Sequence, residues 1–260
     1  MLFGRQTLKT WRKLGKIMSL PSHLDWMQSH MAVPVVDHLE GDRFRVYFGV
    51  RDKENRSQIG YAEIDIRNPS KVLCWSEQPA LGLGTLGTFD DNGVTPGYLI
   101  NEGNKKFFYY VGWNKGTTVR MHLFTGLAIS EDGGKTFTRY STAPVLERTK
   151  KDPLLTATLS VLKENQKWRM WYISGERWEM RPDGSYPYYN IKYAESKNGF
   201  DWHRDGHVCI DFKSPDEHAL ARPCVLYQDG VYKMWFSHKG QDYRLGYAES
   251  HDGLNWKRMD

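Results

Sequence analysis

Four segments of the chain share one pattern of hydrophobic and polar positions. Each begins at a proline, runs through a few apolar residues, turns at a polar or glycine-containing pair, and continues into an aromatic-rich stretch. The four segments start at Pro34, Pro96, Pro153 and Pro223. Two apolar runs joined by a tight polar turn are typical of a β-hairpin. We therefore expect four hairpins, with their turns at Glu40-Gly41, Glu102-Gly103, Glu164-Asn165 and Asp229-Gly230.

A third strand, with small residues at its centre, is expected after each hairpin. These strands cover residues 59–63, 125–129, 191–195 and 245–249. Glycine and alanine at the centre of a strand allow a neighbouring sheet to approach closely. Three of the strands lead into a turn that ends on an aromatic residue, in segments 130–137, 196–202 and 250–256, where a fourth strand should begin. The first repeat departs from this pattern, because residues 64–69 replace the turn.

Four strands that recur about every 50–70 residues predict an all-β fold of the β-propeller type. The middle positions of the third strands, 60, 126, 192 and 246, are 66, 66 and 54 residues apart. A β-sandwich would lack this recurrence, and the absence of long segments with helical period disfavours an α/β fold. We expect one domain over residues 1–260, with blades at about 30–80, 89–146, 152–211 and 217–260. Residues 11–17 are expected to form a lone strand that closes the ring against the last blade. The ring then has either four blades or a fifth that is missing from this chain.

Composition adds a ligand class and excludes several partners. Aromatic residues make up 14% of the chain, and they favour strands and line binding pockets, which suits a flat or ring-shaped ligand. The 36 basic and 31 acidic residues are interspersed, so no basic face for nucleic acid is expected. Three widely spaced cysteines indicate neither a disulfide framework nor a zinc site, and we expect no metal or cofactor. Without a secretory signal or a long apolar stretch, we expect a cytoplasmic protein that does not cross a membrane. The sequence leaves the oligomeric state open.

The repeat resembles that of a known enzyme family. The segments that carry the resemblance include GLAISEDGGKTF, WRMWYISGERW, YNIKYAES and YKMWFS, and the resemblance extends from Trp11 to Arg258. It is similar to the five-bladed β-propeller glycosidases of glycoside hydrolase families 43 and 32, and most similar to uncharacterised glycosidase-like proteins associated with polysaccharide biosynthesis. This resemblance implies that the inner strands of the blades line a central cavity. The loops that precede those strands would then meet at one mouth.

Every mouth loop contains carboxylates, as hydrolysis of a glycosidic bond by an acid and a base requires. The family pattern, carried over by position, implies Asp25 as base or nucleophile, Asp152 as supporting acid and Glu217 as general acid, with Asp90 as a rival to Asp25. Two positions depart from the family. Residues 31–34 lack the acid found in the family's first strand, and Glu217 lies six residues before Pro223 rather than one or two.

Each of these carboxylates also has a structural interpretation. Asp152 precedes a proline and can simply begin a strand, and Glu217, beside Asp216, can be a solvated loop charge. Asp25 can cap a turn or helix ahead of Trp26, and Asp90 lies in a good turn sequence.

Seven further residues are candidates for substrate binding. His30 and His218 could hydrogen-bond a sugar or a carboxylate, and Arg222 could clamp the carboxylate of an acidic sugar or neutralise Glu217 or Asp152. Arg148 has a weaker claim of the same kind. Aromatic faces stack on sugar rings, so the candidates for stacking are Trp26, Trp113 and Trp178, with packing between blades as the alternative. The long insertion at residues 175–190 could cover the mouth.

The leading hypothesis is therefore a glycosidase that hydrolyses a glycan by carboxylate acid/base chemistry. The separation of the two carboxylates would decide between a retaining and an inverting mechanism. The alternative is a non-catalytic carbohydrate-binding propeller that assists surface-polysaccharide assembly. A weaker third hypothesis is a propeller that binds other proteins.

Overall fold

The computed structural model describes residues 12–260, and every regular element in that range is a β-strand. Consistent with this, residues 12–260 contain no helix able to cross a membrane. The all-β prediction is confirmed. The four predicted hairpins are present, each with a two-residue turn between consecutive strands. In the last hairpin both turn residues, Asp229 and Gly230, have positive φ angles of 55° and 78°, which matches the right-handed twist of the flanking strands.

The first half of the chain forms two four-stranded antiparallel sheets. Sheet 1 consists of β1 (Ser29–Glu40), β2 (Arg43–Arg51), β3 (Ser57–Asp65) and β4 (Asn68–Trp75), in that spatial order. Sheet 2 consists of β5 (Val94–Glu102), β6 (Lys105–Lys115), β7 (Met121–Ser130) and β8 (Thr138–Arg139), in the same order.

The second half repeats this arrangement. Sheet 3 consists of β9 (Thr156–Glu164), β10 (Lys167–Arg181), β11 (Gly184–Ser196) and β12 (Trp202–His203), and β13 (Val208–Ile210) also pairs with β11. Sheet 4 consists of β14 (Ala219–Gln228), β15 (Val231–Lys239), β16 (Tyr243–Ser250) and β17 (Lys257–Arg258). One parallel bridge, between Tyr189 and Ala219, joins sheets 3 and 4.

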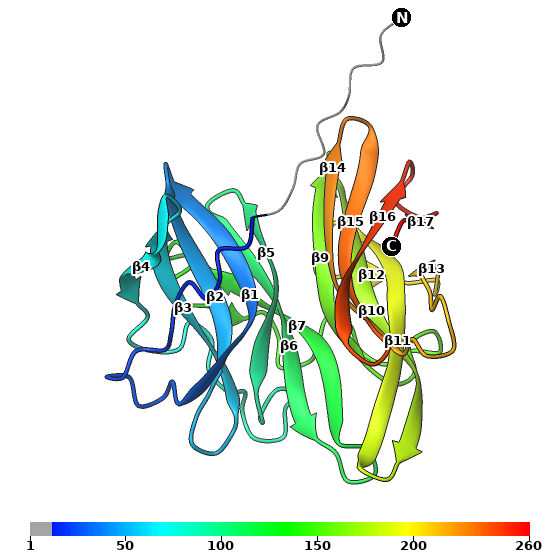
Figure 1. Ribbon diagram of the computed structural model, residues 1–260, viewed down its shortest axis with the longest axis horizontal. Coiled ribbons are helices and arrows are strands. Elements are labelled where there is room, and N and C mark those ends of the chain that lie inside the picture. The colour runs from blue at the N-terminus through cyan, green and yellow to red at the C-terminus, as the bar shows by residue number, and fades with distance from the viewer. Residues whose placement is uncertain (1–11) are drawn as a thin grey trace, which may run out of the picture.

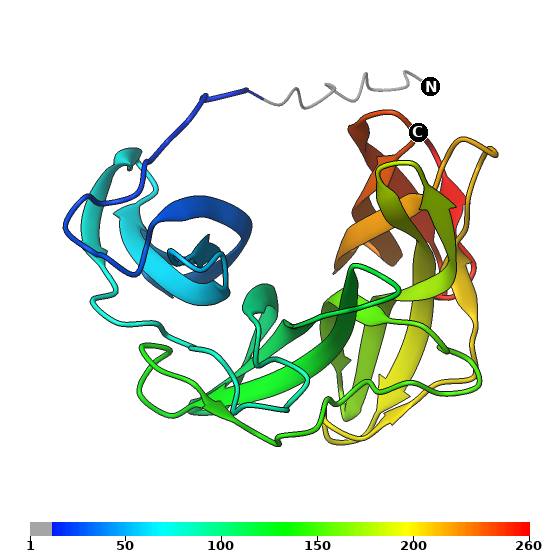
Figure 2. The same ribbon diagram turned by 90° about the horizontal axis from the view of Figure 1, so that it is seen from below.

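The four sheets follow one another in chain order around an arc that stays open between sheet 1 and sheet 4 (Figures 1 and 2). The first strand of each sheet lies on the inside of this arc. Along the inside, β5 contacts both β1 and β9, and β9 contacts β14. The loops before β1, β5, β9 and β14 therefore lie at the same end of the molecule, which we call the axial end.

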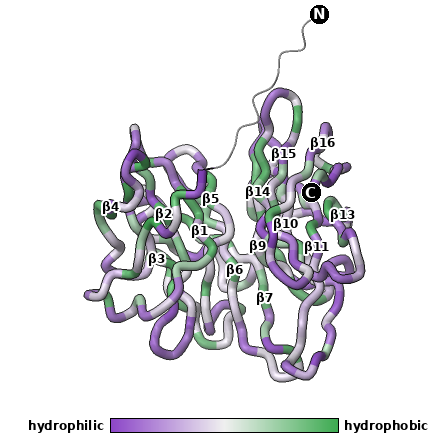
Figure 3. Tube along the Cα trace, viewed as in Figure 1, coloured by the Kyte–Doolittle hydropathy of each residue, from purple (hydrophilic) through white to green (hydrophobic). Residues whose placement is uncertain are grey.

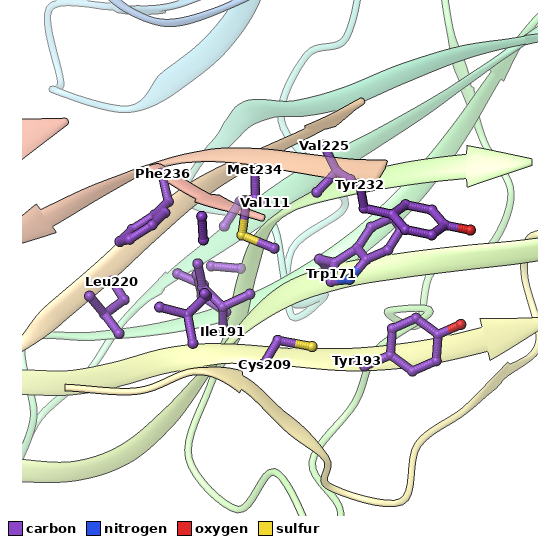
Figure 4. Packing of buried hydrophobic residues seen from close by; sticks show 14 of the residues in the cluster. Val111, Trp171, Ile191, Tyr193, Cys209, Leu220, Val225, Tyr232, Met234 and Phe236 are labelled. Atoms are coloured by element: carbon purple, nitrogen blue, oxygen red, sulfur yellow. The ribbon is translucent and has the colours of Figure 1, made fainter. Parts of the chain in front are cut away.

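Hydrophobic residues fill the spaces between successive sheets. Along the chain, apolar segments coincide with the central strands, while the connecting turns are polar (Figure 3). Between sheets 3 and 4, the buried Trp171 contacts Tyr193 and Tyr232, with ring centroids 5.8 Å and 6.0 Å apart (Figure 4). Each fully buried side chain of this size stabilises the fold by about 1.5–3 kcal/mol relative to an exposed one. The sheets are therefore held together mainly by burial of aromatic surface.

One hydrogen bond recurs at all three sheet-to-sheet contacts. An aromatic side chain on the second strand of one sheet donates to a glycine carbonyl in the turn before the fourth strand of the next sheet. The three bonds are Tyr47 to Gly134 (2.6 Å), Tyr109 to Gly199 (2.5 Å) and Trp171 to Gly253 (2.7 Å). These bonds fix how far each sheet can slide along the previous one.

The turns that supply these carbonyls are built by their own side chains. In the first, Ser130 Oγ accepts a hydrogen bond from the Gly134 N–H at 2.8 Å, and Asp132 accepts one from the Lys135 N–H at 2.9 Å. Gly134 has a φ angle of +87°, and a Cβ there would lie 2.3 Å from the Tyr47 hydroxyl. The position therefore requires glycine.

Two sequence-based expectations are corrected. Residues 12–17 form no strand, so the described part of the predicted closing strand does not pair with sheet 4; Trp11 lies outside the described residues. The insertion at residues 175–190 is not a separate loop. It extends β10 and β11 into a longer hairpin that continues to the pair Arg181–Gly184.

Replacing Tyr109 with phenylalanine removes one of the three recurring bonds, and the buried Gly199 carbonyl then keeps only the hydrogen bond from Trp202 Nε1 at 3.1 Å. We expect Tyr109→Phe to lower the free energy of unfolding by about 1–2 kcal/mol, measured by urea denaturation. Tyr227→Phe is the control, because Tyr227 is 54% exposed and its hydroxyl makes no hydrogen bond within residues 12–260. Equal losses in the two variants would contradict this role.

Candidate functional site

Three of the four catalytic candidates occupy equivalent positions in sheets 2, 3 and 4. Asp90, Asp152 and Glu217 each lie in the loop before an inner strand and are buried, with 0%, 0% and 6% of their surface exposed. Each contacts a side chain on the second strand of its own sheet: Tyr110 at 2.9 Å, Tyr172 at 3.0 Å and His238 at 2.9 Å respectively. Each also pairs with an arginine on or next to the fourth strand, namely Arg139 at 2.7 Å, Arg204 at 2.9 Å and Arg258 at 2.7 Å. We call this arrangement the carboxylate clamp.

Asp152 has the most complete set of partners. Its Oδ1 accepts hydrogen bonds from Tyr172 and from Ser174 Oγ at 2.8 Å, and its Oδ2 accepts one from Arg204. The ammonium group of Lys192 is 3.8 Å from Oδ1. A carboxylate with both oxygens occupied by protein donors ties its loop to the sheet.

Glu217 is held in its ionised form. Arg258 binds both carboxylate oxygens, at 2.7 Å and 2.8 Å, and the Lys213 N–H donates to Oε2 at 2.7 Å. Burial alone would raise the pKa of Glu217, but the hydrogen bonds from Arg258 and Lys213 outweigh it and lower the pKa below its ordinary value. A general acid needs the opposite shift, because it must carry a proton near neutral pH. These surroundings favour a structural role over the proposed role of proton donor.

Asp90 is also enclosed. Thr88 donates to Oδ1 at 2.8 Å, while Tyr110 and Arg139 share Oδ2. A Cβ at Gly84 would lie 2.0 Å from Oδ1, which shows how closely the loop wraps around the carboxylate.

Asp25 lies apart from this pattern. It is exposed, and its carboxylate makes no hydrogen bond or ion pair within residues 12–260. The neighbouring Trp26 donates to the Glu77 carbonyl at 3.0 Å, and a Cβ at Gly60 would lie 2.8 Å from its ring. Trp26 therefore packs against sheet 1, which favours the packing interpretation over stacking on a sugar.

The inner strands share a second feature near the axial end. All four carry an irregularity in register, at segments 32–35, 96–98, 156–159 and 221–224. Such β-bulges redirect side chains and are frequent next to functional sites. None of these segments contains a carboxylate, and Arg222 is their one charged residue.

Arg222 connects three inner strands. Its backbone N–H donates to Thr158 Oγ1 in β9 at 3.1 Å, and its Nη2 donates to the Pro34 carbonyl in β1 at 2.9 Å. The sequence left open whether Arg222 neutralises Glu217 or Asp152. It pairs with neither, since those carboxylates are bound by Arg258 and Arg204.

The remaining binding candidates divide into exposed and buried side chains. His30 and Arg148 are exposed; His30 Nδ1 lies 2.8 Å from Ser29 Oγ, and Arg148 lies 2.9 Å from His122 Nδ1. His218 is buried, with its ring centroid 5.7 Å from that of Tyr188, and burial lowers its pKa.

The two remaining tryptophans are partly buried. Trp113 donates to Thr95 Oγ1 at 2.5 Å, beside the start of β5. Trp178 packs against the hydrophobic cluster between sheets 3 and 4, which favours the packing interpretation. Trp113 packs against the same cluster, and its hydrogen bond to Thr95 places it at the axial end.

An aromatic pair at the axial end was not singled out from the sequence. The hydroxyls of Tyr189 and Tyr243 are 3.2 Å apart, and the Lys239 ammonium lies 5.2 Å from the Tyr243 ring centroid. Tyr243 is 56% exposed. No local sequence motif marks this pair. Its two residues come from sheets 3 and 4 and meet where β11 of sheet 3 pairs with β14 of sheet 4.

A hollow of about 1110 Å³ lies at the opposite end of sheet 3. It is lined by residues that include Glu164, Glu195 and Lys167. Both acids are engaged, Glu164 by the Tyr232 hydroxyl at 2.8 Å and Glu195 by Lys167 at 2.6 Å. No cluster of three or more metal-ligating side chains occurs among the residues the structure describes.

Comparison with known proteins shows both relatives and structural neighbours. No protein-family model matches the chain. The uncharacterized proteins MT1551 and Rv1502, from two strains of Mycobacterium tuberculosis, are each 41% identical over 249 residues, covering 96% of this chain and 82% of theirs. This chain belongs to their family.

Solved glycoside hydrolases share its fold at low sequence identity. The solved complex of BT0996 with RGII has a TM-score of 0.68 at 19% identity, covering 87% of this chain and 72% of that one. The GH32 β-fructofuranosidase of Bombyx mori has a TM-score of 0.66 at 16% identity, covering 88% and 48%. A thermostable family-43 glycoside hydrolase has a TM-score of 0.61 at 19% identity, covering 87% and 71%. The family of the mycobacterial proteins thus has a glycosidase-like, all-β fold.

The clamp at Glu217 predicts acid sensitivity. Because the folded pKa lies below the ordinary value of 4.5, the unfolded chain takes up the proton first as pH falls. The stabilisation is complete above that value and is lost as pH falls through the lowered folded pKa. We expect Glu217→Gln to destabilise the protein by about 3 kcal/mol at pH 7, since it leaves Arg258 partly uncompensated, and to flatten the pH dependence below pH 5.

The matched control is Asp216→Asn, which changes the exposed neighbouring acid. It should alter the free energy of unfolding by less than about 0.5 kcal/mol at pH 7. Urea denaturation at pH 7, 5 and 4 measures both variants. If Glu217→Gln is as stable as wild type at pH 7, the clamp contributes nothing to folding.

Proposed function

We propose that this chain is a non-hydrolytic carbohydrate-binding protein that holds a glycan at its axial end. The observation that carries the proposal is the carboxylate clamp. The three deepest acids near this end, Asp90, Asp152 and Glu217, are buried and paired with arginines. Hydrolysis requires one protonated and one ionised carboxylate across a space that admits the sugar. Acids whose oxygens already accept protein hydrogen bonds do not fit that requirement.

The irregular segments of the inner strands support the same proposal. The four irregular segments, 32–35, 96–98, 156–159 and 221–224, contain no aspartate, glutamate or histidine. These segments therefore offer no replacement for the acid and base of a glycosidic cleavage.

The axial end nevertheless offers groups that suit a sugar. Tyr243 presents an exposed ring, and Trp113 lies beside the start of β5. His30 and Arg148 are exposed polar side chains at or near inner-strand starts. Aromatic faces with a few polar groups are the usual composition of sugar-binding surfaces. An accessory role in polysaccharide assembly is the form of glycan binding that we propose.

We also propose that the four sheets are blades of a five-bladed propeller with a place for one more blade. Sheet 4 repeats the pattern of aromatic residues with which sheet 3 contacts the sheet that follows it. Trp235 pairs with Tyr247 in the register of Trp171 with Tyr193. Tyr247 donates to Glu249 at 2.6 Å, as the Tyr193 hydroxyl does to the glutamate two residues later at 2.9 Å. A further sheet between sheets 4 and 1 would supply the glycine carbonyl for Trp235.

Glycoside hydrolysis is the second candidate, and the shared fold with glycoside hydrolases favours it. A panel of neutral and acidic oligosaccharides separates the two functions. Binding is measured by glycan array and calorimetry, and cleavage by mass spectrometry after prolonged incubation. We expect binding without cleavage. Release of shorter products by wild type, abolished in Glu217→Gln at a temperature where that variant is folded, would establish hydrolysis instead.

Removing the exposed ring of Tyr243 should weaken glycan binding. We expect Tyr243→Ala to raise the dissociation constant by about 3–10-fold, because a stacked aromatic contributes about 0.5–1.5 kcal/mol. Tyr227→Ala is the control, since Tyr227 is similarly exposed but lies at the other end of sheet 4. Equal affinities of the two variants would exclude Tyr243 from the binding surface.

A further inference from the structure

Arg222 is a cation without a counter-ion in the part of the chain that the structure describes. No carboxylate of residues 12–260 lies within ion-pair distance of its guanidinium, and Nη1 is buried without a hydrogen-bond partner. Buried polar groups are almost always paired, and an exception calls for an explanation. The other deep arginines, such as Arg139 and Arg258, each hold a carboxylate.

The backbone at Arg222 is left-handed, as it is at Val33 in the irregular segment of β1. The φ angle of Arg222 is +55°, a left-handed conformation that costs a non-glycine residue about 1 kcal/mol or more. Glycine would adopt it freely, so folding alone favours glycine at this position. The bulge before Pro223 turns the guanidinium toward β1, where it reaches the Pro34 carbonyl.

The position of Arg222 is central to the axial end. Its contacts with Thr158 and Pro34 place it between β9, β14 and β1. Its remaining N–H groups are the only cationic donors in the irregular segments of the inner strands. A ligand entering between these strands would meet this guanidinium.

We infer that Arg222 binds a carboxylate of the glycan, so that the ligand is an acidic, uronate-type sugar. This inference rests on the function proposed above. The planar fork of a guanidinium matches the two oxygens of a carboxylate. A carboxylate carries one negative charge and so neutralises one arginine. A phosphate monoester, with a charge of about −1.5 to −2, would leave excess negative charge beside the half-buried guanidinium.

The test uses galacturonate and glucuronate oligosaccharides, the same oligosaccharides after reduction of their carboxyl groups to alcohols, and sulfated glucose oligosaccharides. Calorimetry measures affinity for wild type, Arg222→Gly, Arg222→Lys and Arg67→Gln. We expect wild type to bind at least one acidic probe about tenfold or more tightly than its reduced form. Arg222→Gly should remove this preference, and Arg222→Lys should keep only part of it because the fork is lost.

Two controls keep the result interpretable. Arg222→Gly relieves the strained φ angle, so its melting temperature should not fall, and a loss of binding cannot then be attributed to unfolding. Arg67→Gln removes an exposed positive charge in the turn between β3 and β4, at the end of sheet 1 away from the axial end, and should leave the preference unchanged.

The possible failures are distinguishable. Equal binding of acidic and reduced probes by wild type, or a preference that survives in Arg222→Gly, overturns the inference and leaves the proposed function standing. Tighter binding of the sulfated probe overturns the assignment to a carboxylate. If wild type binds no glycan of the panel, the proposed function fails and the inference fails with it.

Discussion

The requirement that a buried charge be paired organises this molecule. The fourth strands of sheets 2, 3 and 4 are only two residues long, too short for their ladder hydrogen bonds to hold them. In each sheet a loop carboxylate, such as Asp152, contacts a side chain of the second strand and binds an arginine on or next to the fourth. Removing one partner of such a pair leaves an uncompensated buried charge, which typically costs several kcal/mol. Sheet 1 has an eight-residue fourth strand, β4, and it is the sheet in which none of the candidate carboxylates forms a clamp.

This constraint bears directly on function. Glu217, whose pKa is lowered by Arg258, is unavailable as a proton donor near neutral pH, and the oxygens of Asp90 and Asp152 already accept hydrogen bonds from the protein. This chain therefore shares the fold of glycoside hydrolases, but its buried acids Asp90, Asp152 and Glu217 bind arginines of their own sheets. Arg222 is the cation of the irregular inner-strand segments, and no clamp uses it. Binding of an acidic sugar is the chemistry consistent with this cation.

Much of the fold could be predicted from the sequence because its signals are local. Hairpin turns such as Asp229-Gly230, and the Ser130–Gly134 turn, depend on residues within a few positions of one another. The clamps could not be predicted, because Glu217 meets Arg258 across 41 residues and three strands. A hint was nevertheless present: Asp90 and Asp152 each precede a tyrosine by 20 residues. The strand expected at residues 11–17 failed over its described part because an apolar alternation does not specify a pairing partner.

The protonation state of Glu217 tests the central claim most directly. Its carboxyl carbon can be followed by NMR during a pH titration of the folded protein labelled at glutamate. A clamp residue should titrate below its ordinary value of 4.5, with a chemical shift that moves when Arg258 is replaced by methionine. A titration near pH 6 or above, as a general acid requires, would contradict the account and restore the case for hydrolysis.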